Sequence, residues 1–117
     1  MQGLEHFSEI YLHREPVDMR KSINGLSVIV LEEMGERMTE GRLFVFMSRC
    51  RRRLKILYWD RTGFALWYKR LERERFYWSH GEEDEVIGVS TEELGRLLLG
   101  FDIFQKPHEY LRYEGIG

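Results

Sequence analysis

The sequence predicts an α+β domain, an antiparallel β-meander with two main helices in the order β-α-β-β-β-β-α. Three observations lead to this prediction. Residues 18–34 and 90–101 both place apolar side chains at helical spacing. Between them, short apolar and aromatic runs are separated by brief turns. Connections this short cannot cross over to a parallel neighbour, so the pairing in this part is expected to be antiparallel.

Length and composition restrict the class of protein. With 117 residues the chain is expected to form one domain, residues 1–117, which is too short for a multidomain enzyme. Apolar residues make up 43% of it, more than in disordered tails. The N-terminus lacks the order of a signal peptide, and no apolar run could span a bilayer. We therefore expect a protein that does not contact a membrane. A single cysteine excludes an intrachain disulfide, which fits a reducing compartment, so we expect the protein to be cytoplasmic.

A strand and then a helix are expected in the first third of the chain. Residues 8–13 alternate in the manner of a strand, and Pro16 ends it. Asp18 can cap the helix that follows by accepting a hydrogen bond from a free backbone N–H. The apolar face of this helix consists of Met19, Ile23, Leu26, Val30 and Met34. Gly35 or Gly41 marks the end of the region.

Four further strands are expected in the middle of the chain. They cover residues 43–47, 54–59, 64–71 and 76–78. The first of them is apolar throughout, which is typical of a strand buried on both faces. Together with the short turns, these segments predict the meander.

The register of the hairpin around residues 60–63 has two solutions. A three-residue turn that ends at Gly63 places Lys55 opposite Lys69, a like-charge pair that costs energy unless an anion lies between them. A four-residue loop pairs Lys55 with Tyr68 instead and removes this conflict. We favour the three-residue turn, because glycine readily adopts the positive φ that it needs.

The best-marked helix follows an acidic loop at residues 81–85. Ser90 and Glu93 have the spacing of a capping box, in which each side chain bonds to the backbone N–H of the other residue. The apolar stripe of this helix consists of Leu94, Leu97, Leu98 and Phe101. Gly100 stands near its C-terminal end.

The sequence contains no catalytic or metal-binding constellation, and no cofactor is expected. The four histidines share no metal-ligand spacing, and none is close enough in sequence to Cys50 to act as its base. Arg49 and Arg51 flank this cysteine and would lower its pKa, but a lone cysteine is more often tolerated than catalytic. No phosphate-binding glycine loop is present. We therefore expect a protein that is not an enzyme.

Charge is distributed unevenly along the chain. The net charge of −2 divides into −4 over residues 1–41, +8 over residues 42–75 and −6 over residues 76–117. Such asymmetry points to an anionic partner such as nucleic acid. It agrees equally well with basic strands that pair with the acidic residues 82–85 of the same molecule. The direction in which the central cations point decides between these interpretations.

The candidate nucleic-acid-binding residues are ten central cations. Residues 48–55 alone hold five cations in eight positions, and arginine forks match phosphate geometry. The candidates are Arg49, Arg51, Arg52, Arg53, Lys55, Arg61, Lys69, Arg70, Arg73 and Arg75. Aromatic residues run through the same strands, where rings offer stacking surfaces for bases, although most of them are expected in the core.

Three stretches carry a resemblance to a known family: VDMRKSINGL at 17–26, RLKILYWDRTGF with LWYKRLE at 53–72, and LLGFD at 98–102. Over about residues 8–112 the chain resembles the second open-reading-frame product (the TnpB-type protein) of the insertion-sequence-sixty-six family. Ser48 and Cys50 depart from it, because an asparagine and a further arginine are expected there.

The resemblance implies a bacterial mobile-element accessory protein that is encoded beside a separate, larger transposase. It supplies no catalytic residues. We expect a non-catalytic protein that binds DNA through the central cations. The alternative is an adaptor that bridges transposase components of the same element, or a homo-oligomer in which basic and acidic surfaces of two copies meet. A small carboxylate-dependent nuclease is the least favoured interpretation.

Overall fold

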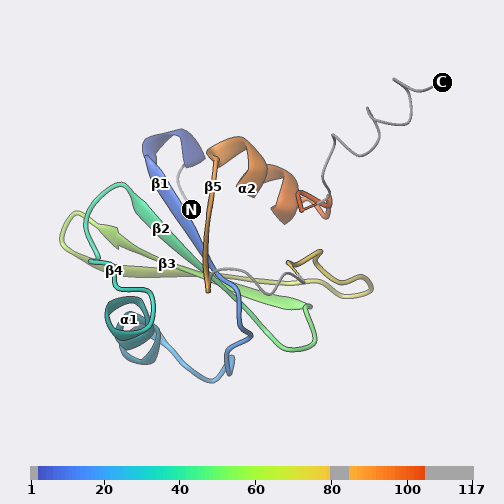
Figure 1. Ribbon diagram of the computed structural model, residues 1–117, viewed down its shortest axis with the longest axis horizontal. Coiled ribbons are helices and arrows are strands. Elements are labelled where there is room, and N and C mark those ends of the chain that lie inside the picture. Colours follow the sequence, from blue (N-terminus) through green and yellow to red (C-terminus); the bar gives the residue numbers. More distant parts are fainter. Residues whose placement is uncertain (1–2, 80–84, 105–117) are drawn as a thin grey trace.

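The computed structural model describes residues 3–79 and 85–104 (Figure 1). Its elements are the 3-10 helix η1 (Leu4–His6), β1 (Glu9–His13), α1 (Ile23–Glu32), β2 (Arg42–Met47), β3 (Arg53–Asp60), β4 (Gly63–Arg70), β5 (Val86–Val89) and α2 (Thr91–Leu98). The predicted α+β class and element order are confirmed, with η1 added before them. In this part of the chain, neither helix has the length and apolar character needed to cross a membrane.

The five strands form one mixed sheet in the order β4-β3-β2-β1-β5. The antiparallel meander is present but comprises only β2, β3 and β4. Strand β1 pairs parallel to β2, because the chain crosses over through α1 between them. Strand β5 pairs antiparallel to the other edge of β1.

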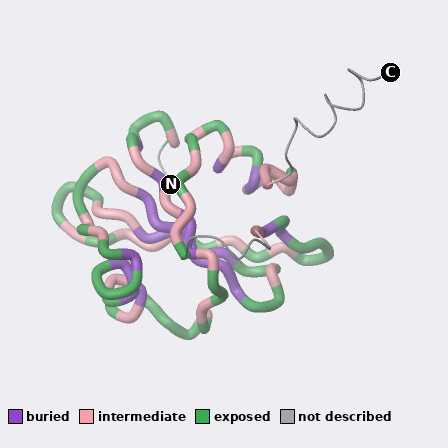
Figure 2. Tube along the Cα trace, viewed as in Figure 1, coloured by how far each residue is buried: buried purple, intermediate pink, exposed green. Residues whose placement is uncertain are grey.

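Helices cover both faces of the sheet (Figure 1). Helix α1 packs Leu26, Ile29 and Val30 on one face, and η1 and α2 cover the other. Strand β2 lies between the two layers and is buried on both faces from Leu43 to Met47, as predicted. The buried residues accordingly gather in the middle of the sheet and on the inner side of α1 (Figure 2).

Helix α1 begins later than predicted, at Ile23 with Ser22 as its N-cap residue. Asp18 does not cap it, because its carboxylate accepts a hydrogen bond from the Arg20 N–H at 2.9 Å and pairs with the Arg20 guanidinium at 2.7 Å. This local turn keeps Met19 out of the helix. Ile23, Leu26 and Val30 are confirmed on the apolar face, which Ile29 joins, whereas Met34 lies beyond the end of the helix at Glu32 and is buried in the same cluster.

The predicted strand at residues 76–78 is wrong. Phe76 and Trp78 are buried, and their segment is held by hydrogen bonds from the Phe76 N–H to the Arg51 carbonyl (2.7 Å) and from Trp78 Nε1 to the Arg14 carbonyl (2.8 Å). These contacts direct the segment away from the free edge of β4. The fifth strand is β5 instead, which the sequence analysis missed because it is four residues long and contains a glycine.

The hairpin of β3 and β4 takes the register that we did not favour. Lys55 lies opposite Tyr68, so the three-residue turn is wrong and the contact with Lys69 is avoided. Pairing continues up to Gly63 because Arg61, with a φ of 51°, supplies the positive φ that we had assigned to this glycine.

Helix α2 begins with the predicted capping box. Ser90 Oγ accepts a hydrogen bond from the Glu93 N–H at 3.0 Å, and the Ser90 N–H donates to Glu93 Oε1 at 2.9 Å. Leu94 and Leu97 are buried as expected. Phe101 is exposed, however, because the helix ends at Leu98, before the stripe reaches it.

Candidate nucleic-acid interface

Seven of the ten candidate cations lie at one end of the sheet. The turn between β2 and β3 and the segment that follows β4 both lie there, at the right of Figure 1. Strand pairing places Arg53 directly opposite Arg70. We call these seven arginines the basic end: Arg49, Arg51, Arg52, Arg53, Arg70, Arg73 and Arg75.

The turn between β2 and β3 is closed by hydrogen bonds around Ser48. The Ser48 N–H donates to the Arg53 carbonyl at 2.9 Å, and the Arg53 N–H donates to Ser48 Oγ at 3.1 Å. The Arg51 N–H donates to the Ser48 carbonyl at 3.0 Å, and Arg51 adopts a φ of 61°. The arginine side chains of this turn therefore project from a fixed backbone.

Further hydrogen bonds join this turn to the segment after β4. The Leu71 N–H donates to the Arg52 carbonyl at 2.8 Å, and the Phe76 N–H donates to the Arg51 carbonyl. The Phe76 ring is fully buried in the core, so the segment is held from inside as well. Two basic segments about twenty residues apart in sequence thus form one continuous surface.

Most of the basic end has no carboxylate partner among the described residues. Arg70 pairs with Glu72 at 2.9 Å, and both side chains are more than half exposed. The other six arginines form no ion pair within residues 3–79 and 85–104. Of the acidic loop, Glu85 is exposed and contacts none of them through an ion pair. Glu82, Glu83 and Asp84 lie outside the described residues.

The two candidate lysines bond to backbone carbonyls. Lys55 Nζ donates to the carbonyls of Met19 (2.7 Å) and Lys21 (2.8 Å) and so fastens the segment before α1 to the sheet. Lys69 Nζ donates to the Leu98 carbonyl at 2.9 Å, at the C-terminal end of α2, where a cation is favoured. Both lysines are partly buried, and they lie on opposite faces of the sheet.

Arg61 is the candidate that the structure separates from the others. It lies in the turn between β3 and β4, at the far end of an eight-residue strand. At about 3.3 Å per residue, the strand separates Arg61 from the basic end by roughly 23 Å. Arg61 is therefore exposed, as Arg52 and Arg53 are, but lies outside the basic end.

Two exposed tyrosines accompany the basic end. Of the eight central aromatic residues, Phe76 and Trp78 are buried, and Tyr58, Trp59 and Trp67 are half-buried. Tyr68 and Tyr77 expose 47% and 51% of their surface. Tyr68 lies two residues before Arg70, on the same face of β4, and Lys55 Nζ lies 5.9 Å from the centroid of the Tyr68 ring.

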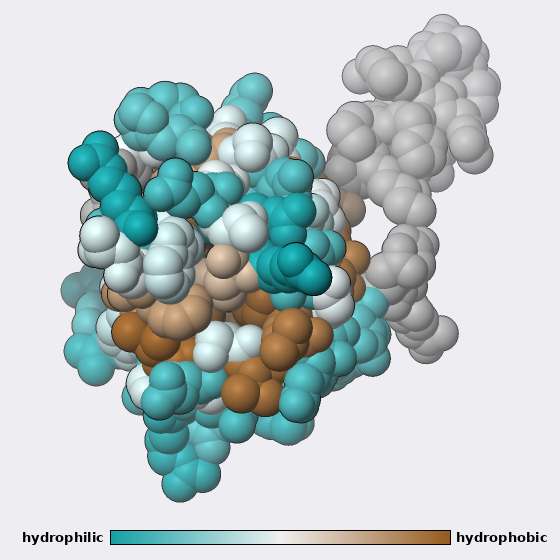
Figure 3. All heavy atoms as spheres, turned by 90° about the vertical axis from the view of Figure 1, so that its left-hand side faces the viewer, coloured by the Kyte–Doolittle hydropathy of each residue, from teal (hydrophilic) through white to brown (hydrophobic). Residues whose placement is uncertain are grey.

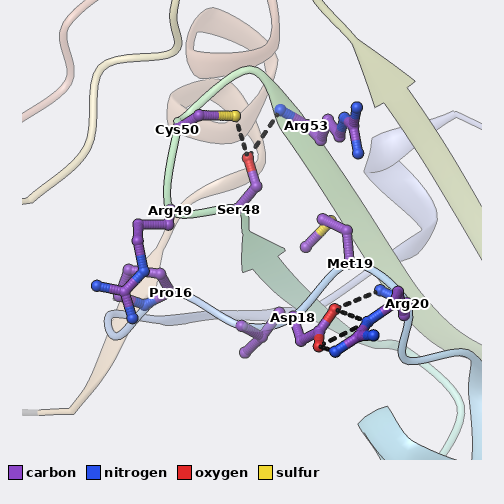
Figure 4. Close-up of a pocket in the computed structure, with 9 residues that line it drawn as sticks. Pro16, Asp18, Met19, Arg20, Ser48, Arg49, Cys50 and Arg53 are labelled. Carbon is purple, nitrogen blue, oxygen red and sulfur yellow. Dashed lines mark hydrogen bonds and ion pairs between the residues drawn. The ribbon is translucent and has the colours of Figure 1, made fainter.

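A cleft of about 600 Å³ separates residues 16–20 from the turn at residues 48–53. Figure 4 shows the Met19 side chain on the side of residues 16–20, facing the turn that carries Arg49 and Arg53. The parallel pairing of β1 and β2 causes this contact, because it places the ends of both strands at the same side of the sheet. No sequence pattern signalled the role of residues 16–20, since it depends on that pairing.

Two side chains of the cleft have shifted pKa values. The hydrogen bonds that Arg20 donates hold the pKa of Asp18 well below its usual range, at about 2. Ser48 Oγ lies 3.4 Å from Cys50 Sγ and is the largest cause of a lowered thiol pKa, followed by the backbone N–H of Arg52. The thiol pKa is thus lowered as expected, but mainly by hydrogen bonds and not by the charges of Arg49 and Arg51.

The described residues contain no group of three or more His, Cys, Asp or Glu side chains that could hold a metal ion. Of the four histidines, His6 and His13 are described, and they lie in different elements. Cys50 is exposed, and the hydroxyl of Ser48, not a histidine, is its side-chain partner. The described surface therefore offers charge and rings for binding, without an arrangement of nucleophile and base.

Comparison with known proteins identifies the family. The family model described as "IS66 Orf2 like protein" matches residues 8–108. The chain belongs to this family. Membership confirms the resemblance and connects the protein with insertion-sequence transposition as an accessory component.

Two proteins of Sinorhizobium fredii are similar over most of the chain. The protein y4hO is 36% identical over 100 residues, which cover 86% of this chain and 85% of its own. The protein y4jC is 33% identical over 102 residues, which cover 87% and 86%. No solved structure matches this IS66 Orf2-like chain.

Proposed function

We propose that this IS66 Orf2-like protein is a non-catalytic accessory component of transposition that binds DNA through its basic end. The observation that carries the proposal is the set of six arginines without a carboxylate partner in the described residues, on a turn and a segment that backbone hydrogen bonds join. Residues 48–53 and 70–76 contain seven arginines but only two carboxylates, Glu72 and Glu74. Guanidinium groups on a fixed backbone bind phosphate oxygens in two-point fashion.

The facing pair Arg53 and Arg70 supports the proposal independently. Like charges directly opposite each other on two strands destabilise the sheet, and an anion between them removes the repulsion. Glu72 neutralises Arg70 only in part, because both partners are largely exposed to solvent. A DNA phosphate at this position would relieve the conflict.

The expected mode of binding is contact with the phosphate backbone. Such contacts orient a protein on DNA but do not read its sequence. Neither helix is basic: α1 has no cation, and α2 has only Arg96. We therefore expect affinity that depends strongly on salt and weakly on sequence.

Fluorescence anisotropy with DNA from the end of the element tests the proposal. The triple variant Arg49→Gln, Arg52→Gln and Arg53→Gln should lose about 100-fold in affinity near 0.1 M salt, and its salt slope should fall by up to about three. The control Arg61→Gln removes an exposed cation outside the basic end and should bind nearly as the unchanged protein does. Equal effects of these changes, or no binding at about 50 mM salt, would contradict the proposal.

A second candidate function, an adaptor for transposase components, is favoured by an apolar surface beside α1. Val28 and Leu31 of α1 are exposed, and with Phe64 of β4 they line a hollow of about 320 Å³. Figure 3 shows apolar side chains gathered on the side of the molecule that carries α1 and the turn between β3 and β4. Exposed apolar patches of this kind commonly mark protein contacts.

Pull-down with the transposase of the same element separates the two functions. Leu31→Ser changes an exposed side chain, so it should leave the fold intact while weakening an apolar contact. Loss of the complex with Leu31→Ser, together with unchanged DNA affinity, would assign the apolar surface to the adaptor function. Loss with the arginine triple variant instead would mean that the partner binds the basic end.

A further inference from the structure

We infer that a groove beside the basic end binds a single-stranded DNA segment, with phosphates at Arg49 and Arg53 and a base stacked on Tyr68. The inference rests on the proposed function and specifies the form of nucleic acid that this site takes. It is carried by three features on one face of the sheet: two adjoining hollows, an exposed tyrosine and the cations Arg53 and Lys55 beside it.

The groove consists of two adjoining hollows. The first is the 600 Å³ cleft between residues 16–20 and the turn at residues 48–53. The second, of about 350 Å³, is lined by Met19, Arg53, Lys55, Leu66 and Tyr68. Since Met19 and Arg53 line both hollows, the two adjoin at these side chains and extend from the turn along the face of β3 and β4.

The groove has a fixed wall. Lys55 Nζ binds the carbonyls of Met19 and Lys21, and the Val17 N–H donates to the Met47 carbonyl at 2.9 Å. These bonds hold the segment before α1 in place, so the opening beside it does not depend on a ligand. Met19 contributes a polarizable thioether to the path, which suits contact with flat rings.

Tyr68 is placed as a stacking platform. The residue is 47% exposed and lines the second hollow, opposite Lys55 on β3. Arg53 is the diagonal neighbour of Tyr68 across β3 and β4, at about 7–8 Å, so a phosphate at Arg53 and a base on this ring lie within reach of one short segment. Base stacking on an aromatic side chain stabilises single-strand complexes and tolerates any sequence.

Stacking on Tyr68 selects single strands. In a duplex the faces of the bases are covered by their neighbours, and only base edges and phosphates are accessible to a protein. An unstacked base can place its face on a tyrosine ring while its phosphates meet the arginines. Single-stranded RNA presents the same chemistry, and DNA is the expected source because the family is connected with insertion sequences.

Anisotropy with a labelled 12-nucleotide strand, its duplex and an RNA of the same sequence tests the inference. We expect the single DNA strand to bind at least about tenfold more tightly than the duplex. Tyr68→Ala should weaken single-strand binding by roughly 5- to 100-fold, whereas Tyr68→Phe, which keeps the ring, should retain it. The matched control is Tyr77→Ala, which removes an equally exposed ring near the basic end but outside the groove.

The outcomes separate this inference from the proposed function. If Tyr68→Ala and Tyr77→Ala behave alike, or the duplex binds as tightly as the single strand, the groove inference is overturned. The proposed function then still stands, provided that the arginine triple variant loses binding. Tighter binding of RNA would overturn the assignment to DNA, and absence of binding to all three probes would overturn both proposals.

Discussion

The two turns of the meander differ in what surrounds them. Each contains an arginine at positive φ, Arg51 with 61° and Arg61 with 51°. The carbonyls of Arg51 and Arg52 accept hydrogen bonds from the segment after β4, and residues 16–20 lie across a cleft from this turn. At the other turn, the Arg61 carbonyl accepts a single side-chain hydrogen bond, from Trp59 Nε1 at 3.2 Å.

Cations that are close in sequence form a continuous surface only where tertiary contacts bring their segments together and hold them in place. Three segments far apart in sequence meet at the basic end, each held by backbone hydrogen bonds or by buried rings. The opposite turn has one cation and two rings, Trp59 and Phe64, in edge-to-face contact at 5.0 Å. The same kind of substitution made at each end of the sheet therefore tests whether anchoring changes its effect on stability and DNA binding.

The largest difference is expected between Phe76→Ala and Phe64→Ala. Phe76 is fully buried and ties the segment after β4 to the core, so its truncation should cost about 3–5 kcal/mol of unfolding free energy. Phe64 is 39% exposed, and its truncation should cost about 1 kcal/mol. Urea unfolding followed by circular dichroism measures both, and equal costs would show that the two ends are equally anchored.

A smaller effect is expected for Ser48→Ala. The Arg53 N–H would lose its acceptor, which should lower the unfolding free energy by about 1 kcal/mol. The Cys50 thiolate would lose its hydroxyl contact, so the thiol pKa should rise and the midpoint of the pH–rate profile for alkylation by iodoacetamide should move to higher pH. Thr62→Ala in the opposite turn should change neither, and an unmoved alkylation midpoint in Ser48→Ala would refute the assigned cause.

The smallest changes in stability are expected for Arg51→Gly and Arg61→Gly. Glycine adopts positive φ without steric cost, so Arg61→Gly should raise the unfolding free energy by about 0.5–1 kcal/mol. Arg51→Gly should gain less, because this side chain is half-buried and its packing is lost. Only Arg51→Gly should also weaken DNA binding, as anisotropy would show; a comparable loss with Arg61→Gly would place the phosphate contacts outside the basic end.

Features that depend on residues close together in the chain could be predicted from the amino-acid sequence. The capping box of Ser90 and Glu93, the apolar face of α1 and the burial of β2 on both sides all follow from spacings within a few positions. Ser90 and Glu93 meet each other at the start of α2, and the other two patterns are visible in the spacing of apolar residues within one element. The order of the elements from β1 to β4, and α2 at the end, followed from such patterns as well, whereas β5 did not.

The contacts between segments far apart in the chain depend on how the whole sheet is assembled. Parallel pairing of β1 with β2 brought Met19 to the turn at residues 48–53, and the hairpin register placed Arg53 opposite Arg70. Local propensity hardly distinguishes these pairings from their alternatives, since a shift by one residue keeps the same hydrogen bonds and changes only which faces are buried. Burial of the whole core selects one of them, and that choice gathers the arginines into a surface.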